Sequence, residues 1–245
     1  MKQLTDVMCV FRIQLMSMRT QAGPFFLAAL VFPAAMYLFA NAVGAPATSG
    51  RDRLRFLAGS IVFSLSLTSI SWLGYLLLEN RFTGRLKLFA TLPLAPGSYI
   101  GGFLVFAFAQ ATLGTTALIL MGRVLGVEAQ PNVIIVALIM SLTVLCLCSF
   151  GVIIAARARS FTEGSLLTDA LGAGLVFLAP VYYSPTVIPR TLRVVCEWLP
   201  TAIAARAMQA ALAGDHGIGT DVSVLSVMAV VSLSIGFKLM KFRED

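Results

Sequence analysis

The sequence predicts an all-α polytopic membrane protein in which residues 1–245 form a single transmembrane domain. Two observations carry this prediction. First, 58% of the residues are hydrophobic and only 12% are charged, which is about half the charged share of an ordinary soluble domain. Second, the apolar residues lie in long uncharged runs, the pattern of helices that cross a bilayer. Basic residues beside such runs set the orientation of the spans and bind anionic lipid headgroups. We therefore attribute the net charge of +7 to contact with membrane lipid and expect no nucleic-acid partner.

Six transmembrane spans are expected, preceded by an interfacial helix over residues 2–20. Apolar residues recur at helical spacing in this first helix, at Leu4, Met8, Phe11, Leu15 and Met18. The spans are predicted at about 25–39, 56–78, 99–121, 133–155, 161–183 and 222–237. Pro33 is expected to kink the first span. Ser160 and Glu163 have the spacing of a capping box that opens the fifth.

The stretch between the fifth and sixth spans, residues 184–221, is too long for a simple connector. It contains two apolar pieces, 188–199 and 201–212, which Pro200 separates. Each piece is too short to cross about 30 Å of hydrocarbon at about 1.5 Å per residue. We therefore expect a re-entrant or interfacial helical hairpin, whose ends must be covered by protein or by a water-filled cavity.

Six spans put both termini on the same side of the membrane. Of the 18 Lys and Arg residues, eleven fall on that side: Lys2, Arg12, Arg19, Arg81, Arg85, Lys87, Arg157, Arg159, Lys238, Lys241 and Arg243. The remaining seven fall on the other side. Because cytoplasmic loops carry an excess of Lys and Arg, both termini are expected in the cytosol, although Arg51, Arg53 and Arg55 run against the rule.

The segment after the second span, residues 79–99, reads ENRFTGRLKLFATLPLAPGSY. On a helix, Phe82, Leu86, Phe89 and Leu92 would share an apolar face. Arg81 and Arg85 would lie four residues apart on another face, and Pro93 and Pro96 would end the helix. Such a basic amphipathic helix binds either a membrane surface or the groove of a partner protein. The alternative is an ordinary loop whose charges set the topology.

Catalytic and metal-binding patterns are missing from the sequence. It contains no HExxH, GxSxG or GxxxxGK[ST] motif, no CxxC pair and no paired-carboxylate cluster. The single histidine, His216, lies in a Gly-rich turn. We therefore expect no catalytic residue, no metal site and no cofactor bound by this chain, and a conduit rather than an enzyme.

A hydroxyl-rich face runs along the second span. Its members are Ser60, Ser64, Thr68, Ser71 and Tyr75. They are candidates for lining a substrate pathway. The alternative is that these hydroxyls bond their own backbone or pack against neighbouring helices.

A second candidate face lies on the fifth span. Its members are Asp169, Gly172, Val176 and Tyr183. A carboxylate inside a span is costly unless it is paired or wetted, so Asp169 is a functional candidate. Its alternative is a neutral or hydrogen-bonded acid near the cytosolic end.

Two motifs carry a resemblance to a known family. After the second span, an acidic residue is followed by a glycine, alternating leucines and a Thr-x-Pro-Leu ending: Glu79, Gly84, Leu86, Leu88, Thr91, Pro93 and Leu94. After the fifth span comes APVYYSPTVIPRTLRVVCEWLPTAIAARAMQAAL. In order and spacing, these motifs and the spans around them resemble the permease subunit of type-2 ATP-binding-cassette (ABC) exporters. The chain departs from the family where Leu92 is inserted, where Lys87 lies in the region of an acidic residue, and where Leu199-Pro200 replaces Asn-Pro.

This resemblance implies that the segment after the second span is a coupling helix that docks on a separate cytosolic ABC ATPase subunit. It assigns ATPase coupling to Glu79, Arg81, Phe82, Gly84, Arg85, Leu86, Lys87 and Phe89. ATP and magnesium would be bound by that partner. A second copy of the chain, or a related permease, would complete the conduit with the second and fifth spans at the interface, in the bacterial inner membrane.

Two other classes stay open at this point: a membrane-embedded lipid-modifying enzyme, and a scaffold or assembly subunit of a membrane complex. The sequence leaves the substrate undefined. A mostly apolar pathway with hydroxyls favours an amphipathic or lipid-like one.

Overall fold

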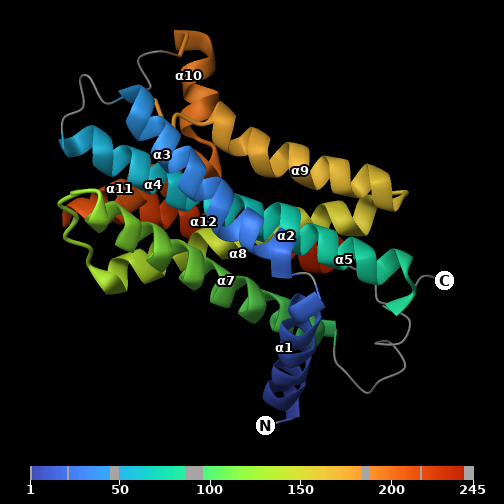
Figure 1. Cartoon of the computed structure of the whole chain (residues 1–245). Coiled ribbons are helices and arrows are strands. Elements are labelled where there is room, and N and C mark those ends of the chain that lie inside the picture. The colour runs from blue at the N-terminus through green and yellow to red at the C-terminus, as the bar shows by residue number, and fades with distance from the viewer. Residues whose placement is uncertain are drawn as a thin grey trace.

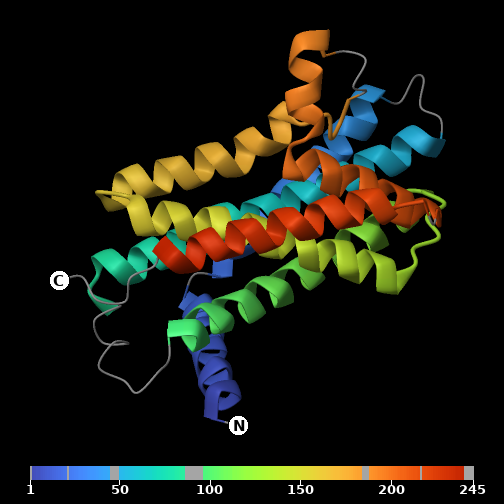
Figure 2. The same cartoon turned by 180° about the vertical axis from the view of Figure 1, so that it is seen from behind.

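The computed structural model describes residues 2–20, 22–44, 50–85, 96–183, 188–215 and 217–239. Every regular element in these ranges is helical (Figure 1). Five helices are long and apolar enough to cross a membrane: Gly50–Phe82, Gly97–Val124, Val133–Arg157, Phe161–Leu178 and Gly219–Gly236. They run lengthwise beside one another, and the described part of the chain begins and ends near the same end of the bundle (Figures 1 and 2). The prediction of an all-α membrane protein is therefore confirmed.

The predicted first span consists of α2 (Ala22–Phe26), the π-helical turn η1 (Leu27–Val31) and α3 (Phe32–Gly44). Its apolar stretch, Ala29–Val43, is shorter than those of the other spans. The irregularity expected at Pro33 takes the form of η1, where the N–H of Phe32 donates to the carbonyl of Leu27. Proline has no N–H to donate four residues back, to Ala29. Ser64 instead donates its hydroxyl to that carbonyl at 3.0 Å.

The second span is the central helix of the bundle and is longer than predicted. It comprises α4 (Gly50–Ser66), the π-helical turn η2 (Leu67–Trp72) and α5 (Leu73–Phe82). Arg51, Arg53 and Arg55, which the sequence analysis placed in a loop, therefore belong to the first turns of α4. A helix can begin there because Asp52 lies in its first turn and forms an ion pair with Arg55 at 3.7 Å.

The helices predicted for the third and fourth spans are present with small extensions, as α7 (Pro96–Val124) and α8 (Val133–Arg157). The fifth, α9 (Phe161–Leu178), ends earlier than residue 183. Half of the predicted capping box is present: the N–H of Glu163 donates to the hydroxyl of Ser160 at 3.1 Å, whereas the carboxylate of Glu163 accepts from the N–H of Arg159, one residue before the cap, at 3.0 Å.

The stretch before the last span forms two short helices, as predicted. They are α10 (Arg190–Glu197) and α11 (Pro200–Ala213). Pro200 opens α11 because its missing N–H has no acceptor in a first turn. α11 is buried in the bundle, whereas α10 buries no residue and projects from the end away from the termini (Figure 1). A re-entrant path through the bilayer stays a prediction. The last span is α12 (Gly219–Leu239).

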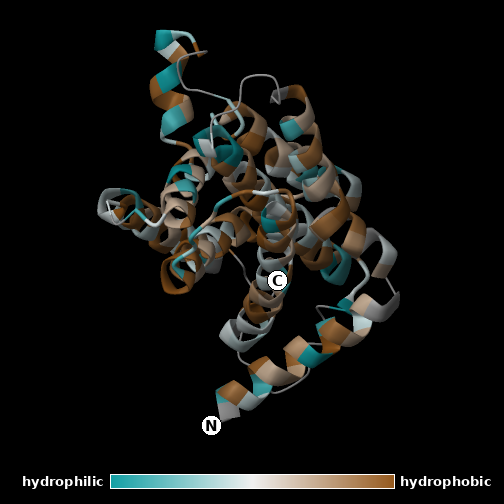
Figure 3. Cartoon of the chain, turned by 60° about the vertical axis from the view of Figure 1, so that its left-hand side comes forward, coloured by the Kyte–Doolittle hydropathy of each residue, from teal (hydrophilic) through white to brown (hydrophobic). Residues whose placement is uncertain are grey.

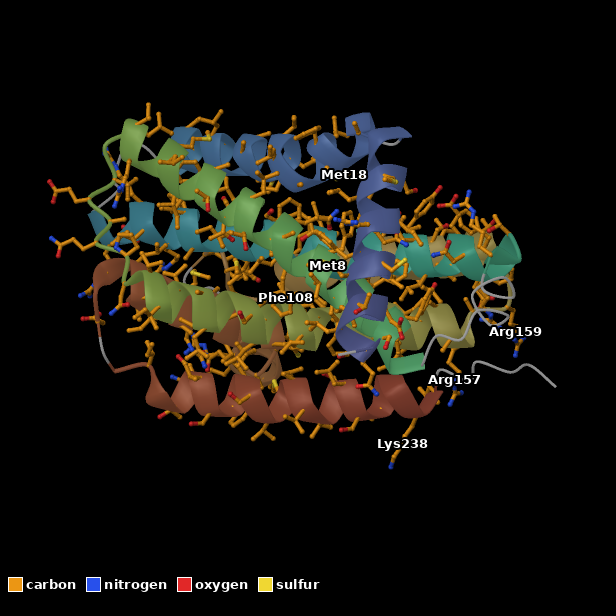
Figure 4. All side chains as sticks on the ribbon, turned by 90° about the horizontal axis from the view of Figure 1, so that it is seen from below. Met8, Met18, Phe108, Arg157, Arg159 and Lys238 are labelled. Carbon is orange, nitrogen blue, oxygen red and sulfur yellow. The ribbon has the colours of Figure 1, made fainter. Side chains whose placement is uncertain are left out.

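The N-terminal helix α1 (Lys2–Thr20) lies across α7 at the end of the bundle near the termini (Figure 4). A Cβ at Gly102 would collide with Val10, so the absence of a side chain there lets the two helices pack closely. Leu4, Met8 and Leu15 stay exposed on α1. An exposed apolar stripe of this kind suits a helix at a lipid surface. Figure 3 shows the mixed hydropathy of α1 beside the apolar bundle.

Candidate functional site

The base of the predicted coupling segment lies where α5 ends. The last residue of α5 is Phe82. Gly84, two residues further on, has a φ of +77°, a left-handed conformation that glycine adopts without strain and that ends a helix. The helix that contains Arg81 and Phe82 therefore does not continue through Gly84, contrary to the prediction of one helix over this stretch. Leu86, Lys87 and Phe89 lie outside the described residues, so their coupling role stays a prediction.

Arg81 does not point along the predicted segment but reaches the end of another span. Its Nη1 donates to the carbonyls of Ala155 at 2.8 Å, Ala158 at 3.0 Å and Ala156 at 3.3 Å. The last carbonyls of a helix lack backbone partners and carry the negative end of the helix dipole, so a guanidinium is well matched to them. Arg81 thereby joins the end of α5 to the junction of α8 and α9.

The other end of the segment is also held at its base. Asn80 donates its side-chain N–H to the hydroxyl of Tyr99, at the start of α7, at 3.2 Å. Both residues are buried. The segment that leaves α5 and the segment that enters α7 are therefore fastened together by a buried side-chain hydrogen bond. No local pattern singles out Asn80, because its partner lies 19 residues away.

The remaining charged pair at this base is partly exposed. Glu79 and Arg85 form an ion pair at 3.3 Å, and Phe82 is 42% exposed. Figure 4 shows Arg157, Arg159 and Lys238 at the same end of the bundle as the end of α5. The basic residues that the topology argument grouped together on α8, the α8–α9 turn and α12 therefore lie together in space.

The predicted hydroxyl face of the second span points into the bundle. Ser60, Ser64 and Thr68 are buried. Ser60 and Thr68 donate to carbonyls of their own helix at 2.9 and 2.8 Å, at Phe56 and Ser64. Within this chain they serve helix packing and backbone bonding, which is the alternative that the sequence analysis kept open. Whether they meet substrate stays a prediction.

The C-terminal half of this face, which contains Ser71 and Tyr75, contacts α9. Ser71 donates to the carbonyl of Thr168 at 3.3 Å, and the ring of Tyr75 lies 5.3 Å from that of Phe161. Ser66, which the sequence analysis did not single out, donates to the carbonyl of Gly172 at 2.7 Å. The second and fifth spans are therefore held together by hydroxyl-to-carbonyl hydrogen bonds, which are strong where no water competes.

The structure separates the four candidates on the fifth span. Gly172 and Val176 are buried against the central helix, whereas Asp169 is exposed. Tyr183 lies beyond the end of α9, and its hydroxyl donates to the carbonyls of Phe177 and Leu178 at 3.1 and 3.3 Å. Asp169 is exposed although helical spacing places it on the same side of α9 as the buried Gly172 and Val176, whereas Tyr183 lies outside the helix because α9 ends at Leu178.

Asp169 shares its outer face with large apolar side chains. Leu166 and Phe177 lie three residues before and eight residues after it, and they are 66% and 54% exposed. Beyond this face, the described residues contain no group of three His, Cys, Asp or Glu side chains that could hold a metal ion.

Comparison with known families gives one match that spans most of the chain. The family model described as ABC-2 type transporter matches residues 7–213. The matched region begins in α1 and ends with α11, so it contains the base of the coupling segment and both short helices before the last span. Comparison with curated proteins gives no match.

Proposed function

Since the chain belongs to the ABC-2 type transporter family, we propose that this membrane permease subunit exports its substrate and takes the energy from a separate cytosolic ATPase. On this proposal ATP and magnesium bind the partner, and residues 79–99 form the contact with it. The bilayer is the bacterial inner membrane, with both termini in the cytosol. The basic residues gathered where α5, α8 and α12 end support this orientation.

The hydrogen bonds of Arg81 carry the coupling proposal. A segment that transmits movement must be attached rigidly to the spans that it moves. Arg81 attaches it to the α8–α9 junction, and Asn80 attaches it to α7 through Tyr99. A push on the segment would therefore reach three spans at once.

A second copy of the chain, or a related permease, completes the conduit in this proposal. The outer face of α9 supports it, since Asp169 stands there among exposed Leu166 and Phe177. A carboxylate facing lipid is costly, whereas one facing another protein or a water-filled pathway is tolerated. An amphipathic substrate would suit a pathway with apolar walls and one acid.

Family membership favours transport over a membrane-embedded lipid-modifying enzyme. The scaffold or assembly alternative shares the same architecture. The two are separated by ATP turnover: a permease stimulates hydrolysis by its partner in the presence of substrate, whereas a scaffold leaves turnover independent of cargo.

The coupling role is tested by a matched pair of substitutions in the predicted segment. A buried aromatic anchor commonly costs more than about 2 kcal/mol when truncated, whereas a rim charge costs less and mainly changes the salt dependence. We therefore expect Phe89→Ala to release the ATPase, or to uncouple hydrolysis from transport, more severely than Lys87→Ala. Retention of the ATPase on the purified permease and transport in vesicles are the two measurements. If Phe89→Ala leaves both unchanged in a normally inserted protein, the segment is a topology-setting loop.

A further inference from the structure

A groove lies between the second half of α7 and the first half of α8, far from the coupling segment. Its volume is about 350 Å³. Apolar side chains from both helices form most of its walls: Ile119, Leu120, Val133, Val136, Ala137 and Met140. Leu120 and Val133 are 56% and 75% exposed, so the groove opens on the outer surface of the bundle. It lies toward the end away from the chain termini, where α7 leads into α8 (Figure 1).

A cation stands at one end of this groove. Arg123 lines it and is exposed, and its guanidinium makes no hydrogen bond or ion pair with any residue that the structure describes. Side chains of a helix lean toward its N-terminus. The Arg123 side chain therefore leans over the turn at Ile119, toward the interior of the groove.

Two threonines lie about two helical turns before Arg123 on α7. Thr115 and Thr116 both line the groove. Thr115 is only 4% exposed, and its hydroxyl has no hydrogen-bond partner in the described part of the chain. A buried hydroxyl without a partner costs free energy, and native proteins leave few such groups. Since Thr115 lines the groove, a ligand with an acceptor at that depth would supply the missing partner.

We propose that this groove binds one membrane phospholipid with an anionic headgroup. Such a lipid carries a phosphate, ester carbonyls and an acyl chain, in the order in which the groove presents a cation, hydroxyls and apolar walls. Its phosphate meets Arg123, its ester carbonyls lie a few ångströms deeper and accept hydrogen bonds from Thr115 and Thr116, and an acyl chain follows the apolar walls along Ala137 and Met140. A cationic side chain at the mouth of an apolar groove is complementary to a lipid with an anionic headgroup and an apolar chain. The site is separate from the proposed coupling segment and from the buried hydroxyl face of the second span.

The test is native mass spectrometry of the protein released from nanodiscs that contain equal amounts of phosphatidylglycerol and phosphatidylcholine. We expect one retained phospholipid on the wild type, with phosphatidylglycerol preferred. Arg123→Gln is expected to lower that preference about fivefold, since one basic residue near the surface contributes about that much. Arg123→Lys keeps the charge and is expected to keep most of the preference. Ala137→Phe is expected to lower retention of both lipids, because the ring fills the groove.

Arg51→Gln is the matched control, since Arg51 is an exposed arginine at the same end of the bundle. It is expected to leave the retained lipid unchanged. Three outcomes would overturn the proposal: a wild type that retains no phospholipid, an equal loss in Arg51→Gln and Arg123→Gln, or full retention in Ala137→Phe. Unchanged elution and thermal unfolding of each variant show that the lipid, and not the fold, was affected. Because the nanodisc contains no ATPase, the result is independent of the transport proposal.

Discussion

Removing the guanidinium of Arg81 is the sharpest test of how the end of α5 is joined to the rest of the bundle. Nη1 carries two hydrogens, so two of its three contacts are full hydrogen bonds, those to Ala155 at 2.8 Å and Ala158 at 3.0 Å. The contact with Ala156 at 3.3 Å shares one of those hydrogens. Arg81→Ala removes both bonds and leaves the last carbonyls of α8 to water.

The expected loss follows from these two bonds. A hydrogen bond to a charged group contributes about 1.5–3 kcal/mol. Because Arg81 is only half-buried and water can reach this helix end, we expect a total of about 2 kcal/mol, below the sum of the two. For a chain of this size that corresponds to a fall in Tm of about 4–8 °C. Arg85→Ala removes an exposed ion pair with Glu79 and is expected to cost at most about 1 kcal/mol.

The assay is thermal unfolding of the purified permease in detergent, followed by transport and ATP hydrolysis in vesicles with the partner ATPase. Arg81→Ala is expected to unfold at a lower temperature than Arg85→Ala and to transport less substrate per ATP hydrolysed, with the ATPase still bound. Arg81→Lys keeps the charge but presents a single ammonium group, so it is expected to fall between the two. Equal melting temperatures for Arg81→Ala and Arg85→Ala would refute the idea that Arg81 fastens the end of α5 to the α8–α9 junction. Normal coupling in a destabilised Arg81→Ala would leave it a purely structural contact.

Three further predictions concern the spans themselves. A Cβ on Gly151 would lie 3.2 Å from the backbone oxygen of Ile70, and backbone cannot give way, so Gly151→Ala is expected to cost about 1–3 kcal/mol of stability in detergent unfolding. Gly174→Ala, with no atom within 4 Å of the added Cβ, is its control and is expected to be neutral or stabilising. Ser64→Ala removes the hydroxyl that binds a first-span carbonyl, so it is expected to cost about 1 kcal/mol in the same assay, and an unchanged value would mean that this bond adds nothing. Asp169→Asn is expected to lower transport in vesicles while the complex still assembles, and full transport would reduce the acid to a structural role.

The sequence alone was sufficient for features that depend on neighbouring residues. Uncharged apolar runs predict spanning helices because the bilayer requires each span to satisfy its own backbone. The N-cap at Ser160 and the break at Pro200 depend on residues within one turn, and the structure confirms both. The break at Gly84 was open to the same reasoning, because a glycine just after a helical run commonly ends it. The prediction of one helix that contains Phe82 and continues past Gly84 was therefore wrong.

Only the tertiary structure decided how the polar groups are paired. The carbonyls that Arg81 binds lie 74 to 77 residues further along the chain, and the carbonyl that Ser64 binds lies 35 residues before it. Helical periodicity places a side chain on a face of its own helix but leaves open which neighbour that face meets. The exposure of Asp169 follows from the same limit, because the packing of α9 against the central helix buries Gly172 and Val176 but leaves Asp169 exposed. Hydrogen bonds over such separations exist only once the spans have packed, so no local pattern in the sequence contains them.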